Sequence, residues 1–308
     1  MSTALVTDST AYLPDDLIEG LAVHVVPLHV VLGGTEHAEG VDVDPAAVAA
    51  ALRSFTPVST SRPAPAAFLS AYQAAADAGA ESIVSVHISG EMSSTIGGAS
   101  LAAEESPVPV TVVDSRALGM VMGFAVVTGA RLAAGGASAA EVADAVRATC
   151  AASTVVFYVD TLEYLRRGGR IGKAGAMVGS ALSIKPILGL RDGHIVPLER
   201  VRTSSRAIAR LEDLAAVAAT ALPREATGVD VAVHHLDSPE RAERLAERLR
   251  ARLGEVEVRV VELGAVVGAH VGPGTLAVAV VPRVAEASGP GAGSAPGSAP
   301  GSAPGSAH

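Results

Sequence analysis

The chain has little of what several protein classes require. Among its 308 residues there is one cysteine, Cys150, no tryptophan, and only 3% aromatic residues. A single cysteine cannot form an internal disulfide, so we expect a protein of the reducing cytoplasm. The lone thiol cannot lead a zinc cluster, and the histidines and carboxylates show no compact ligand spacing, so we expect no metal. With so few aromatics, the core must consist of Ala, Val, Leu and Ile.

Positive charge and long apolar runs are also scarce. Lys173 and Lys185 are the only lysines, and the formal net charge is −9, which argues against nucleic acid or anionic lipid as a partner. The longest apolar run, 117–130, is too short to span a membrane and is typical of a buried core helix. The chain starts directly with a short strand pattern, without the pattern of a signal peptide. We therefore expect a soluble protein.

Short β-rich runs alternate with alanine-rich helical runs, which predicts an α/β fold with mainly parallel or mixed sheets flanked by helices. The length favours two domains. We place the first at residues 1–153 and the second at 154–285, followed by a Gly-Ser-Ala-Pro tail, 286–308, that we expect to be disordered. The predicted strands are 4–7, 23–31, 82–88, 109–113, 155–159, 229–235, 256–263 and 275–281, with a hairpin of 184–190 and 195–201. The predicted helices are 46–55, 66–78, the two flanks of Gly135-Gly136, 205–221 and 239–253.

Polar residues follow three of the predicted strands directly. Asp8-Ser9, Ser89–Thr95 and Asp114-Ser115 each come where a strand ends, so they should gather at one edge of the sheet. In the second of these segments, Ser93 and Ser94 lead into a helix, where free backbone N–H groups and the helix dipole favour an anion. No lysine or arginine lies in that segment, so we expect an anion to be held by neutral donors alone.

Seven motifs resemble those of one family, in the same order along the chain. They are Thr7–Pro14, Thr60–Pro63, Ile88–Ser100, Val113–Arg116, Asp160–Gly172, Leu182–Leu188 and His270–Thr275. We expect Thr60–Pro63 to be a hydroxyl-rich turn. Together the seven motifs resemble the DegV family of bacterial fatty-acid-binding proteins, from about Thr3 to about Arg283. The resemblance implies a two-domain DegV-like fold with a lipid tunnel between the domains.

The resemblance also implies a function without catalysis by this chain. In the family, the residues that match Thr60, Ser61, Ser93 and Ser94 hold or flank the fatty-acid carboxylate, and the one that matches His270 lies nearby. Family members present the bound long-chain fatty acid to a separate ATP-dependent fatty-acid kinase, which forms an acyl phosphate for phospholipid synthesis. The family often has other residues at Arg62, and it is open whether Arg62 brings a charge to the head group or only solvates a helix end.

A basic cluster interrupts the acidic chain and is a candidate surface for the kinase. Arg170 and Lys173 belong to it, and the position of Arg202 is associated with kinase docking in the family. A solvated helix face is an equally good interpretation of the cluster. The glycine-rich stretch that ends at Ala174 has neither the spacing nor the hydroxyl of a P-loop. We therefore expect the chain itself to hold no ATP and to need no cofactor.

Two other functions stay open at this point. The first is a serine hydrolase with Ser93 as nucleophile, His270 as base and Asp8 or Asp114 behind the histidine, although the Gly-x-Ser-x-Gly elbow is missing. The second is an enzyme related to dihydroxyacetone kinases, which would bind a small hydroxyketone and no lipid. The sequence leaves acyl length and saturation, the identity of the kinase and the oligomeric state undetermined.

Overall fold

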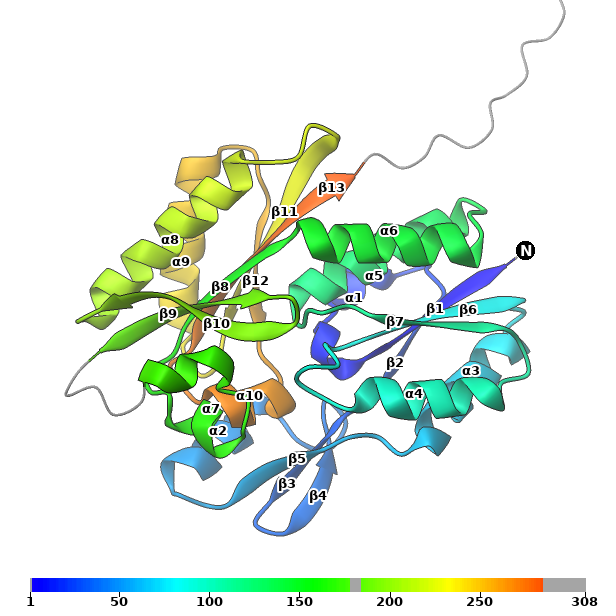
Figure 1. Cartoon of the computed structure of the whole chain (residues 1–308), viewed down its shortest axis with the longest axis horizontal. Helices are drawn as coiled ribbons and strands as arrows, with labels where there is room; N and C mark the ends of the chain where they lie inside the picture. The colour runs from blue at the N-terminus through cyan, green and yellow to red at the C-terminus, as the bar shows by residue number, and fades with distance from the viewer. Residues whose placement is uncertain (1, 178–183, 285–308) are drawn as a thin grey trace, which may run out of the picture.

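Three β-sheets organise the chain. The computed structural model describes residues 2–177 and 184–284 (Figure 1). The first half supplies a four-stranded sheet on the right of Figure 1, the second half a six-stranded sheet on the left, and a small three-stranded sheet lies below them. The predicted α/β class is confirmed. The expected tail 286–308 and the start of the motif at Leu182 lie outside the described residues.

The four-stranded sheet is parallel, in the order β2-β1-β6-β7. Every residue of β1 and β6 is buried, as expected for a sheet covered on both faces. Leu5 and Val84 pack toward α5 and α6, whereas Val6 and Ile83 pack toward α3 and α4. The elements are β1 (Thr3–Asp8), β2 (Val23–Val26), β6 (Ser82–His87), β7 (Val110–Asp114), α3 (Pro65–Asp77), α4 (Thr95–Glu104), α5 (Met120–Ala134) and α6 (Ala139–Ala152).

The six-stranded sheet is mixed, in the order β10-β9-β8-β13-β11-β12. One face packs against two long helices through alternate residues such as Val156, Val278 and Val231. The residues between them, such as Val155 and Ala279, face the first half of the chain. The elements are β8 (Thr154–Tyr158), β9 (Lys185–Arg191), β10 (His194–Val201), β11 (Ala226–His235), β12 (Val258–Glu262), β13 (Leu276–Val284), α8 (Ser204–Thr220) and α9 (Pro239–Leu253).

The small sheet is antiparallel, in the order β4-β3-β5, and it joins the two halves. Val30 on β3 and Val48 on α2 share a buried cluster with Ala265 and Ala269 on α10, which comes from far along the chain. The elements are β3 (His29–Leu32), β4 (Thr35–Ala38), β5 (Val58–Ser61), α2 (Pro45–Arg53) and α10 (Ala265–Val271). The remaining short helices are α1 (Asp15–Ile18), α7 (Glu163–Arg167) and two 3₁₀ turns, η1 (Ser9–Ala11) and η2 (Gly172–Met177).

Most predicted elements are confirmed, but two predictions were wrong. The strand predicted over 23–31 is two strands in different sheets, β2 and β3, separated at Pro27, which has no N–H for a sheet. Thr60 lies in β5 rather than in a turn, and α10 was not predicted. The predicted hairpin of β9 and β10 is confirmed. Its central residues, Asp192 and Gly193, both have positive φ, as a tight hairpin turn requires.

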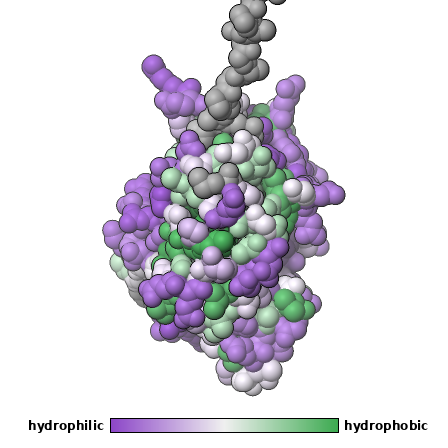
Figure 2. Space-filling view, turned by 90° about the vertical axis from the view of Figure 1, so that its right-hand side faces the viewer, coloured by the Kyte–Doolittle hydropathy of each residue, from purple (hydrophilic) through white to green (hydrophobic). Residues whose placement is uncertain are grey.

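The surface is mixed in character. Figure 2 shows hydrophilic residues around most of the outline of one face, with apolar residues gathered toward its middle. Among the described residues, no helix combines the length and the apolar character that crossing a bilayer demands.

Candidate functional site

A cavity of about 360 Å³ lies between the six-stranded sheet and the first half of the chain. Its floor is the inner face of that sheet, with Leu190 on β9, Phe157 on β8, and Ala277 and Ala279 on the adjacent strand β13. In the register, Ala277 pairs with Phe157 and Ala279 with Val155. The cavity exists because two alanines occupy the middle of the sheet, where larger side chains would fill the space.

The five side chains predicted to hold a carboxylate all line this cavity. Thr60 and Ser61 end β5, Ser93 and Ser94 precede α4, and His270 lies in the last turn of α10. The Thr60 hydroxyl is 2.9 Å from Nε2 of His270, a contact between residues 210 positions apart. The polar end of the cavity is therefore assembled from three separate segments of the chain. We call it the mouth.

His270 is a neutral group at the mouth. Burial, with a smaller effect from the nearby Arg170 guanidinium, lowers the pKa of His270 from 6.5 to about 4. Its Nδ1 is buried and has no hydrogen-bond partner among the described residues. A neutral imidazole has one donor and one acceptor nitrogen. If Nε2–H donates to Thr60, the Thr60 hydroxyl proton is free to point at an anion.

The four hydroxyls at the mouth are not equivalent. Ser93 Oγ lies 2.8 Å from the Thr95 hydroxyl and accepts a hydrogen bond from the Thr95 amide at 3.4 Å. Ser61 donates to Glu36 at 2.5 Å, and Ser94 accepts from Nη1 of Arg62 at 2.9 Å. Because a hydroxyl has only one proton, Ser61 has a competing partner in Glu36. Ser93, Ser94 and, where Nε2–H of His270 donates to it, Thr60 can each direct a proton at an anion.

Two arginines reach the mouth, contrary to the expectation of neutral donors alone. Arg62 extends to Ser94, as described above. Arg170 donates to the carbonyl oxygen of Met92 at 3.0 Å and to that of Gly168 at 2.7 Å, and it lines the cavity. The sequence suggested Arg170 only as a docking residue, because nothing in its neighbourhood along the chain connects it to Ser93. The mouth is therefore more cationic than the local motif indicated.

The loop that carries Ser93 is fixed at the edge of the four-stranded sheet. Asp8 accepts hydrogen bonds from the Ile88 amide at 2.9 Å and from Nδ1 of His87 at 3.1 Å. Asp114 accepts from the Gly90 amide at 3.2 Å. The predicted gathering of polar residues at this edge is confirmed, and these carboxylates hold the backbone in place.

The same contacts leave the hydrolase arrangement unassembled. Asp8 is engaged with His87 and Ile88 rather than with His270. Among the described residues, His270 meets no carboxylate, so nothing orients it as a base for Ser93.

Glu39 holds the first turn of α10 in place, a role that the sequence analysis did not predict. Its buried carboxylate accepts from the Val266 amide at 2.8 Å, in the first turn of α10, and from the Ser9 hydroxyl at 2.5 Å. Burial raises the pKa of Glu39. A Cβ at Gly264 would lie 2.2 Å from Oε1 of Glu39, so glycine is required there by close approach. No sequence signal connects Glu39 to a helix more than 220 residues away.

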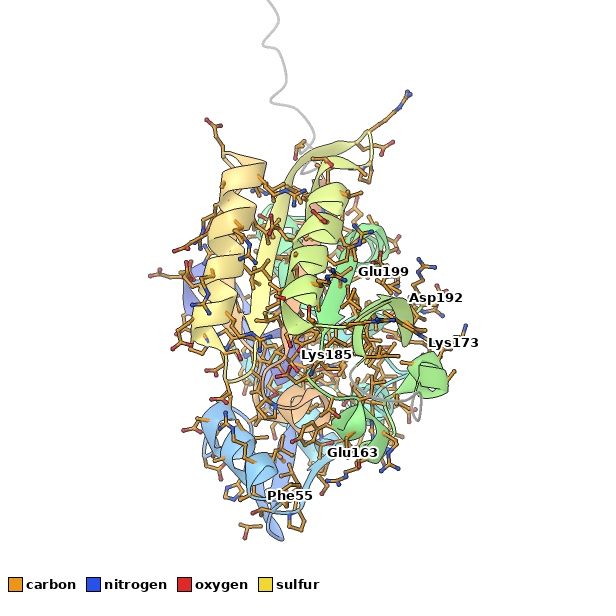
Figure 3. The ribbon with its side chains drawn as sticks, turned by 90° about the vertical axis from the view of Figure 1, so that its left-hand side faces the viewer. Phe55, Glu163, Lys173, Lys185, Asp192 and Glu199 are labelled. Carbon is orange, nitrogen blue, oxygen red and sulfur yellow. The ribbon has the colours of Figure 1, made fainter. Side chains whose placement is uncertain are left out.

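The other predicted docking residues lie away from the mouth. Lys173 is exposed in η2 and, in Figure 3, lies at the edge of the molecule beside the β9–β10 hairpin. Arg202 is exposed between β10 and α8. Within the described part of the chain, neither forms an ion pair. Lys185, in contrast, pairs with Asp160 at 3.5 Å and is labelled near the foot of α8 in Figure 3.

Cys150 lies outside the cavity. Burial, with a smaller effect from Asp114, raises the pKa of its thiol to about 12. The thiol therefore stays protonated at neutral pH and is a poor nucleophile.

Two solved structures with this architecture are described by their fatty-acid binding. A DegV family protein from Thermus thermophilus, described by its fatty-acid binding, is 34% identical with a TM-score of 0.85, covering 92% of this chain and 100% of that one. DegV from Bacillus subtilis, described as a fatty acid binding protein, is 30% identical with a TM-score of 0.83 and the same coverage.

Sequence relatives cover nearly the whole chain. A DegV domain-containing protein of Streptomyces coelicolor is 50% identical over 281 residues, which is 91% of this chain and 98% of the relative. One of Mycobacterium tuberculosis is 38% identical over 285 residues, which is 91% and 97%. The profile of the family described as "Uncharacterised protein, DegV family" matches residues 2–283. The chain therefore belongs to the DegV family.

Proposed function

We propose that this protein binds a long-chain fatty acid, with the carboxylate at the mouth and the tail along the inner face of the six-stranded sheet. One observation carries the proposal: a cavity floored by Ala277, Ala279 and Phe157 has Thr60, Ser93 and His270 at one end. The fatty-acid binding described for the Thermus thermophilus and Bacillus subtilis proteins supports it.

The tail supplies most of the binding free energy. Each methylene transferred from water to an apolar wall contributes about 0.8 kcal/mol. The head group costs free energy unless its oxygens find donors, because an unpaired carboxylate in an apolar site is strongly unfavourable. Thr60 and Ser93 supply hydroxyl donors, and the neutral His270 orients the Thr60 proton. Arg62 and Arg170 add favourable positive charge at the mouth.

A carboxylate held at the mouth stays accessible to a second protein. We infer that this chain is a cytoplasmic carrier without catalytic residues of its own, and that a separate ATP-dependent fatty-acid kinase phosphorylates the bound acid. Lys173 and Arg202, which are exposed and form no ion pair within the described residues, are our candidates for docking it, together with Arg170 at the mouth. Complementary charge on the kinase would speed encounter more than it would raise affinity.

Extraction and titration test the binding proposal. Organic extraction of the purified protein, followed by mass spectrometry, should yield fatty acid in about a one-to-one ratio. Ser93→Ala should weaken binding of oleate roughly tenfold or more, because a hydrogen bond to a charged group contributes about 1.5–3 kcal/mol. Ser100→Ala, on the exposed side of α4, is the matched control and should bind as the unaltered protein does. An empty extract with no saturable binding would remove the proposal.

A further inference from the structure

The cavity is separated from a second hollow by two side chains. A cleft of about 810 Å³ lies between the β7 end of the first sheet and strands β8 and β9 of the second. Among the described residues, Val155 and Leu190 are the ones that line both the cavity and this cleft. Each is half-buried, and each packs against the apolar clusters of both hollows.

The register places these two side chains side by side, far from the mouth. Val156 pairs with Gly189, so the adjacent Val155 and Leu190 are neighbours on the inner face of the sheet. Thr275 bonds the carbonyl oxygen of Val271, one residue after His270, and so marks the mouth end of β13. Ala279, which pairs with Val155, lies four residues further along, roughly 13 Å at the usual rise of a strand.

The cleft behind these side chains has more charged residues in its lining than the cavity has, although apolar residues such as Val121 also line it. Asp114, Arg116 and Arg147 line it, and Arg147 is exposed and paired with Asp144 at 2.9 Å. A tail that passed between Val155 and Leu190 would leave an apolar lining for one that is partly charged. Methylenes beyond that point would add little to the binding free energy.

We propose that Val155 and Leu190 form the end wall that sets the longest acyl chain the cavity holds. This inference rests on the proposed function of fatty-acid binding. Affinity rises by about fourfold for each added methylene while the tail still fits, because each one buried is worth the same transfer free energy. Once the methyl end meets the wall, a longer chain must buckle or leave carbons at the mouth, and affinity stops rising.

Dissociation constants for saturated acids from lauric to behenic acid test the wall in both directions. Val155→Ala removes two side-chain carbons, so the length of strongest binding should move up by about two carbons, with about a tenfold gain for the longer acid. Leu190→Phe enlarges the wall and should shift the length of strongest binding to a shorter acid. Val156→Ala is the matched control, because that side chain lies on the opposite face, under α8, and should leave the preferred length unchanged.

The outcomes separate the wall from the proposed function. A shift of the preferred length in opposite directions for Val155→Ala and Leu190→Phe supports the wall. A uniform change of affinity at every length, with the preferred length fixed, overturns it even if one variant is unstable, since the other still reports. Absence of saturable binding by the unaltered protein at every length would instead reject fatty-acid binding itself.

Discussion

His270 offers a test of the mouth that needs no ligand. Its pKa is about 4 in the folded protein and about 6.5 in an unfolded chain. Between these values the unfolded state binds more protons than the folded one. The contribution of neutral His270 to the free energy of unfolding is therefore fully present above about pH 6.5, and it is lost as the pH falls toward 4.

The magnitude follows from the size of the shift. Each pKa unit corresponds to about 1.4 kcal/mol, so the full shift is worth about 3 kcal/mol. The ring is half-buried rather than fully enclosed, and solvent screening reduces our expectation to about 2 kcal/mol. Replacing His270 by glutamine removes the titration and keeps a polar side chain beside Thr60.

The assay is urea unfolding of delipidated protein, followed by far-ultraviolet circular dichroism between about pH 7 and about pH 4.5. His234 and the acidic groups also titrate in this range, but they are common to both proteins, so the difference isolates His270. We expect the unaltered protein to lose about 2 kcal/mol more than His270→Gln. Parallel curves for the two proteins would refute a neutral His270 with a lowered pKa at the mouth.

Three further predictions concern the tail path, the docking surface and the support of α10. Ala279→Leu should fill the middle of the sheet and weaken stearate binding at least tenfold while leaving laurate less affected, as measured by calorimetric titration; equal loss for both acids would contradict the tail path. Arg202→Ala should bind oleate normally but slow acyl-phosphate formation with the cognate kinase, unlike Arg224→Ala, also an exposed arginine; normal transfer would clear Arg202 of a docking role. Gly264→Ala should push Glu39 from its position and lower the free energy of unfolding by about 1–3 kcal/mol in urea titrations, and an unchanged midpoint would show that the contact is not close.

The sequence determined the local structure well. Short apolar runs such as 82–88 and alanine-rich helical runs predicted most strands and helices, because a strand covered on both faces is apolar along its length. The Asp192-Gly193 pair fixed a hairpin turn, because few residues other than glycine, asparagine and aspartate adopt positive φ easily. The ordered motifs also placed Thr60, Ser93 and His270 together on the strength of the resemblance.

What only the tertiary structure decided are the relations between distant segments. Pro27 split one apolar run between two sheets, a choice that depends on which neighbours are available for pairing. Glu39 capping α10 and Arg170 reaching the mouth join residues that share no local pattern. The free cavity was likewise not predictable from the strand that carries Ala277 and Ala279, because a small side chain leaves a space only when its neighbours across the sheet do not fill it.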